Sequence, residues 1–203
     1  MKEKLLISKG CNRKLSPGGI ATFNLPSRVT CGRACESCYA VKAERCYASA
    51  RAKRWWNLAQ AQRPDFVPRI VLELTEGHCK DIQLLRWHES GDVYSQTYLD
   101  KLTCVAGLVP GKTFYLYTKR LKDWDWSRFK AMENTITIDS LKYGPVNYGD
   151  EAQIGAWRAA GALVCPSTLG YGGKITCNHG CKLCCSRACK ELVEARGVVF
   201  HKH

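Results

Sequence analysis

The chain has 203 residues, which is long enough for one sizeable hydrophobic core but short for two full domains. A composition with 45% hydrophobic and 24% charged residues argues against disorder, and no apolar run approaches the roughly 18 residues that a membrane-spanning helix needs. The excess of 31 Lys and Arg over 18 Asp and Glu gives a formal net charge of +13, which favours polyanionic partners such as nucleic acids.

The first third of the chain predicts one strand and two helices. Residues 20–29 form a β-branched stretch that leads into the first group of cysteines, and we expect a strand there. The Ala-rich, basic stretch 43–62 contains good helix formers throughout and stops before Pro64. A second helix is expected over 68–75.

Strands and helices then alternate with short connections. This pattern is typical of a parallel sheet covered by helices. The expected strands are 82–88, 113–118, 135–139 and 162–164, and the expected helices are 96–106, 124–132 and 150–160. A closed barrel of eight strands needs about 250 residues. The chain therefore predicts a partial parallel (β/α) barrel of about five or six strands, with ligands bound beyond the carboxyl ends of the strands.

A Cys-rich C-terminal segment follows the alternating elements. Residues 165–190 are rich in Gly and Cys and poor in large apolar side chains, so we expect a loop that holds a cluster. A helix through 196 and a strand over 198–200 should complete the chain. We expect residues 1–164 to form the barrel and residues 165–203 to pack on it, as a single compact unit.

The first cysteine group has the spacing C-x₃-C-x₂-C, formed by Cys31, Cys35 and Cys38. The N-terminus lacks an apolar stretch long enough for a signal peptide, so we expect a cytoplasmic protein. In that reducing compartment cysteines are typical of metal or cluster ligation. Three thiolates on one loop can bind three irons of a 4Fe–4S cluster and leave the fourth iron open. The alternative is a zinc site with Cys46 or His78 as fourth ligand.

This motif, followed by the aromatic Tyr39 at the end of a first strand, resembles the signature of the radical S-adenosylmethionine (SAM) superfamily. The resemblance implies that the open iron binds the amino and carboxylate groups of SAM. The cluster then cleaves SAM reductively to methionine and a 5′-deoxyadenosyl radical. It also implies an electron donor such as flavodoxin or ferredoxin.

The second cysteine group contains six cysteines. Cys165 follows a predicted strand, and Cys177, Cys181 and Cys184 repeat the C-x₃-C-x₂-C spacing, with Cys185 and Cys189 in excess. We expect the first four to hold a second 4Fe–4S cluster, because one ligand at a strand end and three on one loop would fix the C-terminal segment to the sheet. Zinc is the alternative metal here.

The combination of CYA near the first group, RWHESGDV in the middle and CP followed by clustered cysteines near the end resembles the phage-encoded gene product 88 domain family. The resemblance spans most of residues 20–203 and implies the cytoplasm of a phage-infected or bacterial host cell. In that family we expect the spacing C-x₂-C-x₂-C, where this chain has C-x₃-C.

Polar residues at the strand ends are the candidate SAM contacts. In radical SAM proteins the second strand ends in a glycine-rich acidic motif that receives the SAM amino group, and Glu89, Ser90 and Asp92 resemble it. A helix N-cap at Asp92 or Ser95 is the alternative. With Tyr39, the predicted cofactor-binding set is completed by His88, Thr118, Lys119 and Asp139.

These features predict a radical SAM enzyme that abstracts hydrogen from a substrate. Two clusters would still leave a charge of about +10, and this excess favours a nucleic-acid base in phage DNA as the substrate. Basic residues of the first long helix would then contact phosphates. Trp55 and Trp56 could stack on bases, but a buried helix face with basic residues at its edge is the favoured interpretation of this pair. The alternatives are a peptide-modifying radical SAM enzyme and a non-catalytic zinc or iron–sulfur protein that binds nucleic acid.

Overall fold

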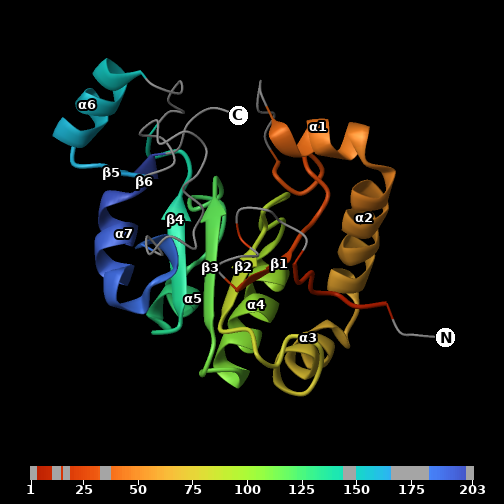
Figure 1. Ribbon diagram of the computed structural model, residues 1–203. Helices are drawn as coiled ribbons and strands as arrows, with labels where there is room; N and C mark the ends of the chain where they lie inside the picture. Colours follow the sequence, from red (N-terminus) through yellow and green to blue (C-terminus); the bar gives the residue numbers. More distant parts are fainter. Residues whose placement is uncertain are drawn as a thin grey trace.

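The computed structural model describes residues 4–10, 15, 19–32, 38–143, 150–165 and 183–199. Its centre is a parallel sheet of four strands in the order β1-β2-β3-β4, so the strands lie side by side in chain order (Figure 1). The strands are β1 (Ile20–Phe23), β2 (Leu84–Trp87), β3 (Thr113–Thr118) and β4 (Thr135–Asp139). Parallel neighbours joined through helices are the arrangement that the alternating sequence predicts.

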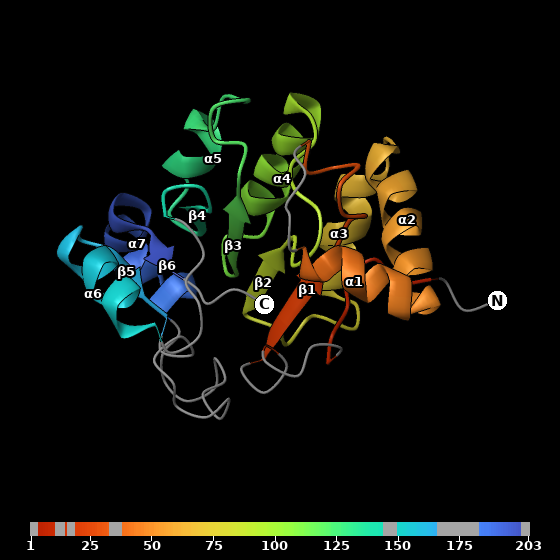
Figure 2. The same cartoon turned by 90° about the horizontal axis from the view of Figure 1, so that it is seen from above.

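Seven α-helices are assigned among the described residues, and α3, α4 and α5 cover one face of the sheet (Figure 2). Their bounds are α1 (Tyr39–Cys46), α2 (Ala48–Gln62), α3 (Phe66–Thr75), α4 (Gln96–Leu108), α5 (Ser127–Ala131), α6 (Glu151–Ala159) and α7 (Lys190–Arg196). Helix α4 begins after Ser95, whose hydroxyl accepts a hydrogen bond from Tyr98 N at 3.1 Å. The sequence alternative of an N-cap at Ser95 is thus confirmed.

The two faces of the sheet have different surroundings. Alternate strand residues, among them Phe23, Trp87 and Phe114, pack with the helices in the larger hydrophobic core. The residues between them, among them Tyr115 and Ile138, face the C-terminal part of the chain in a second core. This alternation follows from the period of two in a β-strand. Cysteines of the second group, among them Cys165 and Cys184, pack against this second core.

Several elements differ in extent from the sequence prediction. The first strand ends at Phe23, because the chain then turns and Leu25 N donates to the carbonyl of Ser90 at 2.9 Å. The single helix predicted over 43–62 is two helices, separated at Tyr47, whose backbone is extended (φ −124°, ψ 99°). Neither Gly nor Pro marks this break, so helix propensity alone could not place it.

The predicted strand at 162–164 does not join the main sheet. Strand β5 (Leu163–Val164) pairs with β6 (Val198–Val199) in a separate parallel sheet of two strands. At the edge of β4 the carboxylate of Glu194 on α7 accepts a hydrogen bond from Thr137 N at 2.7 Å. Helix α7 therefore occupies the edge at which a fifth strand would pair. Six strands are present in the described residues, but only four form the main sheet.

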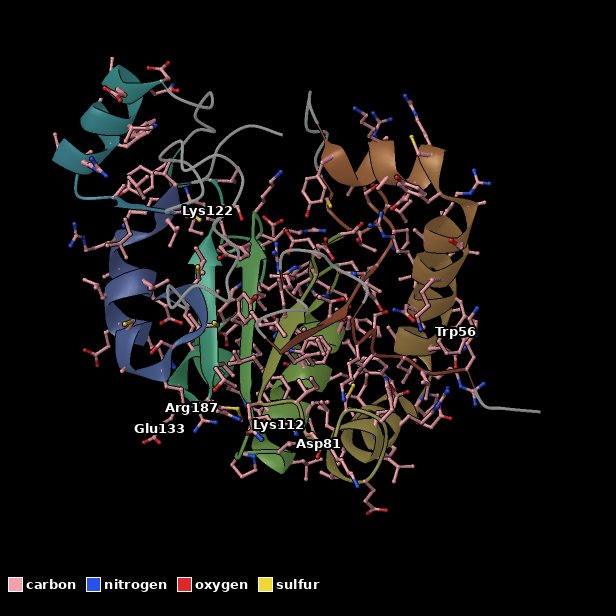
Figure 3. The ribbon with its side chains drawn as sticks, in the orientation of Figure 1. Trp56, Asp81, Lys112, Lys122, Glu133 and Arg187 are labelled. Carbon is pink, nitrogen blue, oxygen red and sulfur yellow. The ribbon has the colours of Figure 1, made fainter. Side chains whose placement is uncertain are left out.

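The described C-terminal part of the chain is fastened to the start of β3. Arg187 donates to Thr113 Oγ1 at 2.9 Å and to the carbonyls of Pro110 and Lys112, both at 2.8 Å. Figure 3 shows Arg187 and Lys112 near the edge where the strands begin, and Lys122 near the opposite edge. No helix in the described part of the chain is long and apolar enough to cross a membrane.

Candidate metal and cofactor site

The first cysteine group lies at the carboxyl ends of the strands of the main sheet. Cys31 follows the turn after β1, and Cys38 directly precedes α1, while Cys35 lies outside the described residues. Burial raises the pKa of the Cys31 thiol to about 11, and the charges that act on this thiol come from Asp92, Cys38 and Lys119. Cys31 and Cys38 are therefore close to each other and to the loops that follow β2 and β3.

Two loops, 24–32 after β1 and 88–92 after β2, form the support of this cysteine group. Ser90 Oγ donates to the carbonyl of Leu25 at 2.9 Å, and Asp92 N donates to Thr30 Oγ1 at 3.1 Å. The Thr30 hydroxyl in turn donates to the carbonyl of Pro26 at 2.8 Å. Buried hydrogen bonds of this kind set the path of the chain up to Cys31.

Gly91 allows the two loops to approach each other. Its φ is +84°, and a Cβ there would lie 2.6 Å from Thr30 Oγ1 and 2.7 Å from Leu25 Cβ. Both the backbone conformation and the space exclude any larger residue without a shift of the loops. The glycine at the centre of ESGD is thus needed for the support beneath Cys31.

Asp92 connects the loop after β2 to the end of β3. Its Oδ1 accepts from Thr118 Oγ1 at 2.7 Å and Val93 N at 2.8 Å, and its Oδ2 accepts from Lys119 N at 2.9 Å. The residue is 3% exposed. Burial raises the pKa of Asp92, while the hydrogen bonds from Lys119 and Thr118 act in the opposite direction. Three predicted cofactor contacts thus bond to one another and fix the loops.

Glu89 is placed differently from Ser90 and Asp92. Its backbone carbonyl accepts a hydrogen bond from the hydroxyl of Tyr39, which begins α1, and its Oε2 accepts from Asn24 at 3.4 Å. The side chain is only partly buried. Of the ESGD acids, Glu89 is the one with a carboxylate accessible beside the cysteine group.

Helix α1 is held against the same loops by an ion pair that sequence reasoning missed. Glu44 Oε1 accepts from Arg54 Nη1 at 3.0 Å and from Ser27 N at 2.8 Å, and both charged side chains are largely buried. Arg54 also donates to the carbonyl of Ala40. The available signal was that Glu44 is the sole acid of α1 and α2.

Arg120, after β3, closes the other side of the cysteine loop. Its Nη1 donates to the carbonyl of Thr30 at 3.3 Å, and its Nε pairs with Asp123 at 2.8 Å. The guanidinium lies against Gly32, where a Cβ would come within 2.8 Å of Nη1. The cysteine loop is therefore enclosed by charged and backbone groups from three strand ends.

Two other predicted cofactor residues lie apart from the cysteine group. His88 is 3% exposed, and its Nε2 lies 2.9 Å from the hydroxyl of Tyr98 on α4. Its φ of 58° turns the ring into the helix-covered core. Asp139 ends β4, at the other side of the sheet from β1, and accepts from Leu141 N at 2.7 Å.

The second cysteine group is described only in part. Cys165 and Cys184 are both partly buried against the second core, and Tyr117 is hydrogen-bonded to Cys184. Cys177 and Cys181 lie outside the described residues. No three His, Cys, Asp or Glu side chains that could hold a metal converge within the described ranges, which lack one member of the first group and two of the second.

The basic side chains of α2 are partly used inside the protein. Arg54 is buried, and Trp56 packs on the larger core with Lys4, Lys53 and Arg69 near its ring. Figure 3 shows Trp56 on the outer side of α2. The exposed part of this surface contains Tyr47, 64% exposed, and Trp55, 48% exposed, with Arg51 between them at helical spacing.

Comparison with known proteins gives one family. The family model described as Gene product 88 matches residues 4–144, which include the main sheet and the first cysteine group. No curated protein and no solved structure matches the chain.

Proposed function

The chain belongs to the gene product 88 family, and from that premise we propose that it is a radical SAM enzyme built on a partial parallel barrel. One observation carries the proposal: the loop of Cys31 and Cys38 is fixed at the carboxyl ends of parallel strands. Parallel α/β proteins bind their ligands at that edge.

The proposed cluster ligands are Cys31, Cys35 and Cys38. Cys38 acts electrostatically on the Cys31 thiol, and their loop is enclosed by groups after β1, β2 and β3. A soft, clustered thiol set fits an iron–sulfur cluster. When bound, such a cluster supplies the electron for reductive cleavage of SAM and leaves one iron for the cofactor's amino and carboxylate groups.

The chain's own residues divide into two roles in this proposal. Glu89 and Tyr39 contact SAM, because both lie beside Cys38 and both are partly accessible. Ser90, Asp92 and Thr118 are positioning residues whose hydrogen bonds hold the loops that carry these contacts. Lys119 serves both purposes, because its backbone N–H fixes Asp92 and its charge acts on Cys31.

The proposed substrate is a nucleic-acid base, and the electron donor is a small protein such as flavodoxin or ferredoxin. The charge of +13 supports a polyanionic substrate. A base inside a duplex is shielded, so the enzyme would act on a flipped base, a single strand or a free nucleotide. Cys165, Cys177, Cys181 and Cys184 are proposed to hold the second cluster.

Metal analysis after anaerobic reconstitution tests this proposal. We expect about four irons and four sulfides per filled site, with the broad visible absorption of iron–sulfur clusters. The triple variant C31A/C35A/C38A should lose about four irons and keep those of the second site. The matched control C46A/C79A/C104A removes three other cysteines and should keep all iron. Zinc in place of iron in the wild-type protein would contradict the proposal.

A non-catalytic nucleic-acid-binding protein is the second candidate. The observation that favours it is the exposed surface of Tyr47, Arg51 and Trp55, where aromatic rings alternate with a cation. Such surfaces stack bases and neutralise phosphates. If this role were the whole function, W55A would abolish binding of single-stranded DNA, and reduced protein given SAM would form no product.

A further inference from the structure

A partly exposed arginine, whose Nε is shielded from solvent, lies on the second face of the main sheet. Arg86 is on β2, in register with Thr22 of β1 and Tyr115 of β3. Residues in register on neighbouring strands point to the same side of a sheet. Arg86 therefore shares a face with Tyr115 and Tyr117, opposite the helix-covered core. No position on the other described strands places an arginine or lysine on this face.

The surroundings of this guanidinium are aromatic. Its Cζ lies 4.8 Å from the centre of the Tyr117 ring, which in turn packs edge-on against Tyr115. Its Nε is shielded from solvent and has no hydrogen-bond partner. A cation over an aromatic face is favourable, but the ring supplies neither a counter-charge nor an acceptor for Nε–H.

No carboxylate forms an ion pair with Arg86 among the residues that the structure describes. Burial acts to lower the pKa of Arg86, while Tyr39, Tyr115, Tyr117 and Glu89 act to raise it, and the pKa stays above its ordinary value. The Arg86 guanidinium therefore stays positively charged. A shielded charge without a paired carboxylate is costly, and none of the residues that the structure describes pairs with Arg86, so its guanidinium is available to an anionic partner.

The position of Arg86 connects it with the candidate site. Tyr39 and Glu89, which lie beside Cys38, are two of the groups that act electrostatically on it. A ligand that is bound beside the cysteine loop and extends past Tyr39 onto the second face of the sheet would therefore contact Arg86. The Arg86 fork offers paired donors of the geometry that carboxylates and phosphates accept.

We propose that Arg86 binds an anionic group, a carboxylate or a phosphate, of a ligand seated on this face, with the Tyr117 ring beneath the guanidinium. The position of this ligand rests on the proposed function. Arg86 is not among the cofactor-binding residues that the sequence predicts. Two ligands carry this chemistry: SAM through its carboxylate, and a nucleotide substrate through its phosphate.

Binding measurements on anaerobically reconstituted protein test the proposal, with SAM, inorganic phosphate and a deoxynucleoside monophosphate as probes. We expect R86M to weaken at least one probe by roughly tenfold or more, because a charge-assisted hydrogen-bond pair is lost. R86K, which keeps the charge but not the fork, should weaken the same probe less. R158M removes an exposed arginine of α6 and should leave all affinities unchanged.

Stability separates a binding role from a structural one. If Arg86 serves a ligand, R86M should unfold at the same temperature as the wild-type protein or higher without ligand, because it removes a shielded charge that has no ion-pair partner among the described residues. Added probe should then raise the unfolding temperature of the wild-type protein and not that of R86M. A destabilised R86M with unchanged affinities would overturn the proposal.

The binding measurements with the separate probes also identify which ligand supplies the anionic group. Loss of SAM affinity alone assigns the cofactor's carboxylate, and loss of nucleotide or phosphate affinity alone assigns the substrate. If R86M fails to fold, R86K decides, because unchanged affinity of folded R86K for every probe would overturn the proposal. A wild-type protein without iron would instead contradict the proposed function, while the phosphate and nucleotide arms would still test Arg86.

Discussion

At the scale of single residues, neighbouring acids in one motif have different roles. Asp92 uses both carboxylate oxygens to join the ends of β2 and β3, whereas Glu89 has a partly exposed carboxylate that accepts from Asn24, and its backbone carbonyl accepts from Tyr39. Residues of one short motif can therefore affect cofactor binding in different ways. Stability and affinity measurements distinguish positioning from contact.

Replacement of the two acids should separate these roles. D92A leaves a buried hydroxyl and buried N–H groups without their acceptor, so we expect a loss of roughly 3 kcal/mol in the free energy of unfolding. E89Q should unfold like the wild-type protein, keep its iron and bind SAM more weakly. Denaturant unfolding and SAM titration check both. Equal loss of stability in the two variants would contradict the division of roles.

His88 should make stability depend on pH. Burial lowers the pKa of His88 from its ordinary value of 6.5 to about 3. The unfolded chain then binds a proton below pH 6.5 that the folded protein does not, so this contribution is complete above pH 6.5 and is lost as pH falls towards 3. Between pH 6.5 and 5 the loss should be about 2 kcal/mol.

The measurement is denaturant unfolding at pH 7.5 and pH 5.0. H88N, whose side chain tolerates positive φ, should show a smaller difference between the two values than the wild-type protein. H78N is the matched control, because His78 follows α3, is partly exposed and lies beside the carbonyl of Ile7, outside the surroundings of His88. The same pH dependence in H88N and the wild-type protein would exclude His88 as its source.

At the scale of elements, packed loops and a capped strand edge hold the candidate site. Gly91 lies where the loops after β1 and β2 meet. At the edge of β4, the Glu194 carboxylate accepts a hydrogen bond from the backbone N–H of Thr137. Neither residue is placed to contact the cysteines directly. Both should nevertheless affect the site through the elements that they join.

G91A should separate the two loops. The new Cβ would lie within 2.7 Å of Thr30 and Leu25 at a positive φ, so we expect a loss of roughly 2 kcal/mol or more in stability. The reconstituted variant should also retain less iron, because the path to Cys31 shifts. G155A, on α6 with open space around it, is the control. Iron content equal to that of the wild-type protein would show that the loop contact does not position the cysteines.

E194A should uncover the edge of β4. Thr137 N then loses its acceptor, and we expect a loss of about 1–2 kcal/mol in the free energy of unfolding. An exposed edge also invites pairing with another chain, so self-association should increase. Sedimentation velocity and denaturant unfolding measure the two effects. E191A alters an exposed acid of the same helix and should change neither.

At the scale of the whole molecule, sequence periodicity predicts much of the fold. The strands 113–118 and 135–139 are confirmed as β3 and β4, because their apolar residues are buried on both faces. The pairing of β5 with β6 was not predictable, since the partners are far apart in the chain and only two residues long. The break at Tyr47 likewise leaves no local signal.

The candidate site shows the same limit. Spacing alone brings Cys31 and Cys38 into one loop, and alternation alone places 88–92 at a strand end. The bonds from Asp92 to Thr118 and from Glu44 to Arg54 depend on the fold and not on spacing. The sequence assigned no role to Arg86, because a lone arginine in a strand gives no sign of whether the folded chain provides its counter-charge.

The central claim, radical SAM chemistry at the first cysteine group, has one direct test. Anaerobically reconstituted protein is reduced with dithionite in the presence of SAM, and 5′-deoxyadenosine is measured by chromatography. The proposal predicts formation of this product by the wild-type protein and by C104A, and none by C31A or C38A. An iron-loaded wild-type protein that binds SAM and forms no 5′-deoxyadenosine would contradict it.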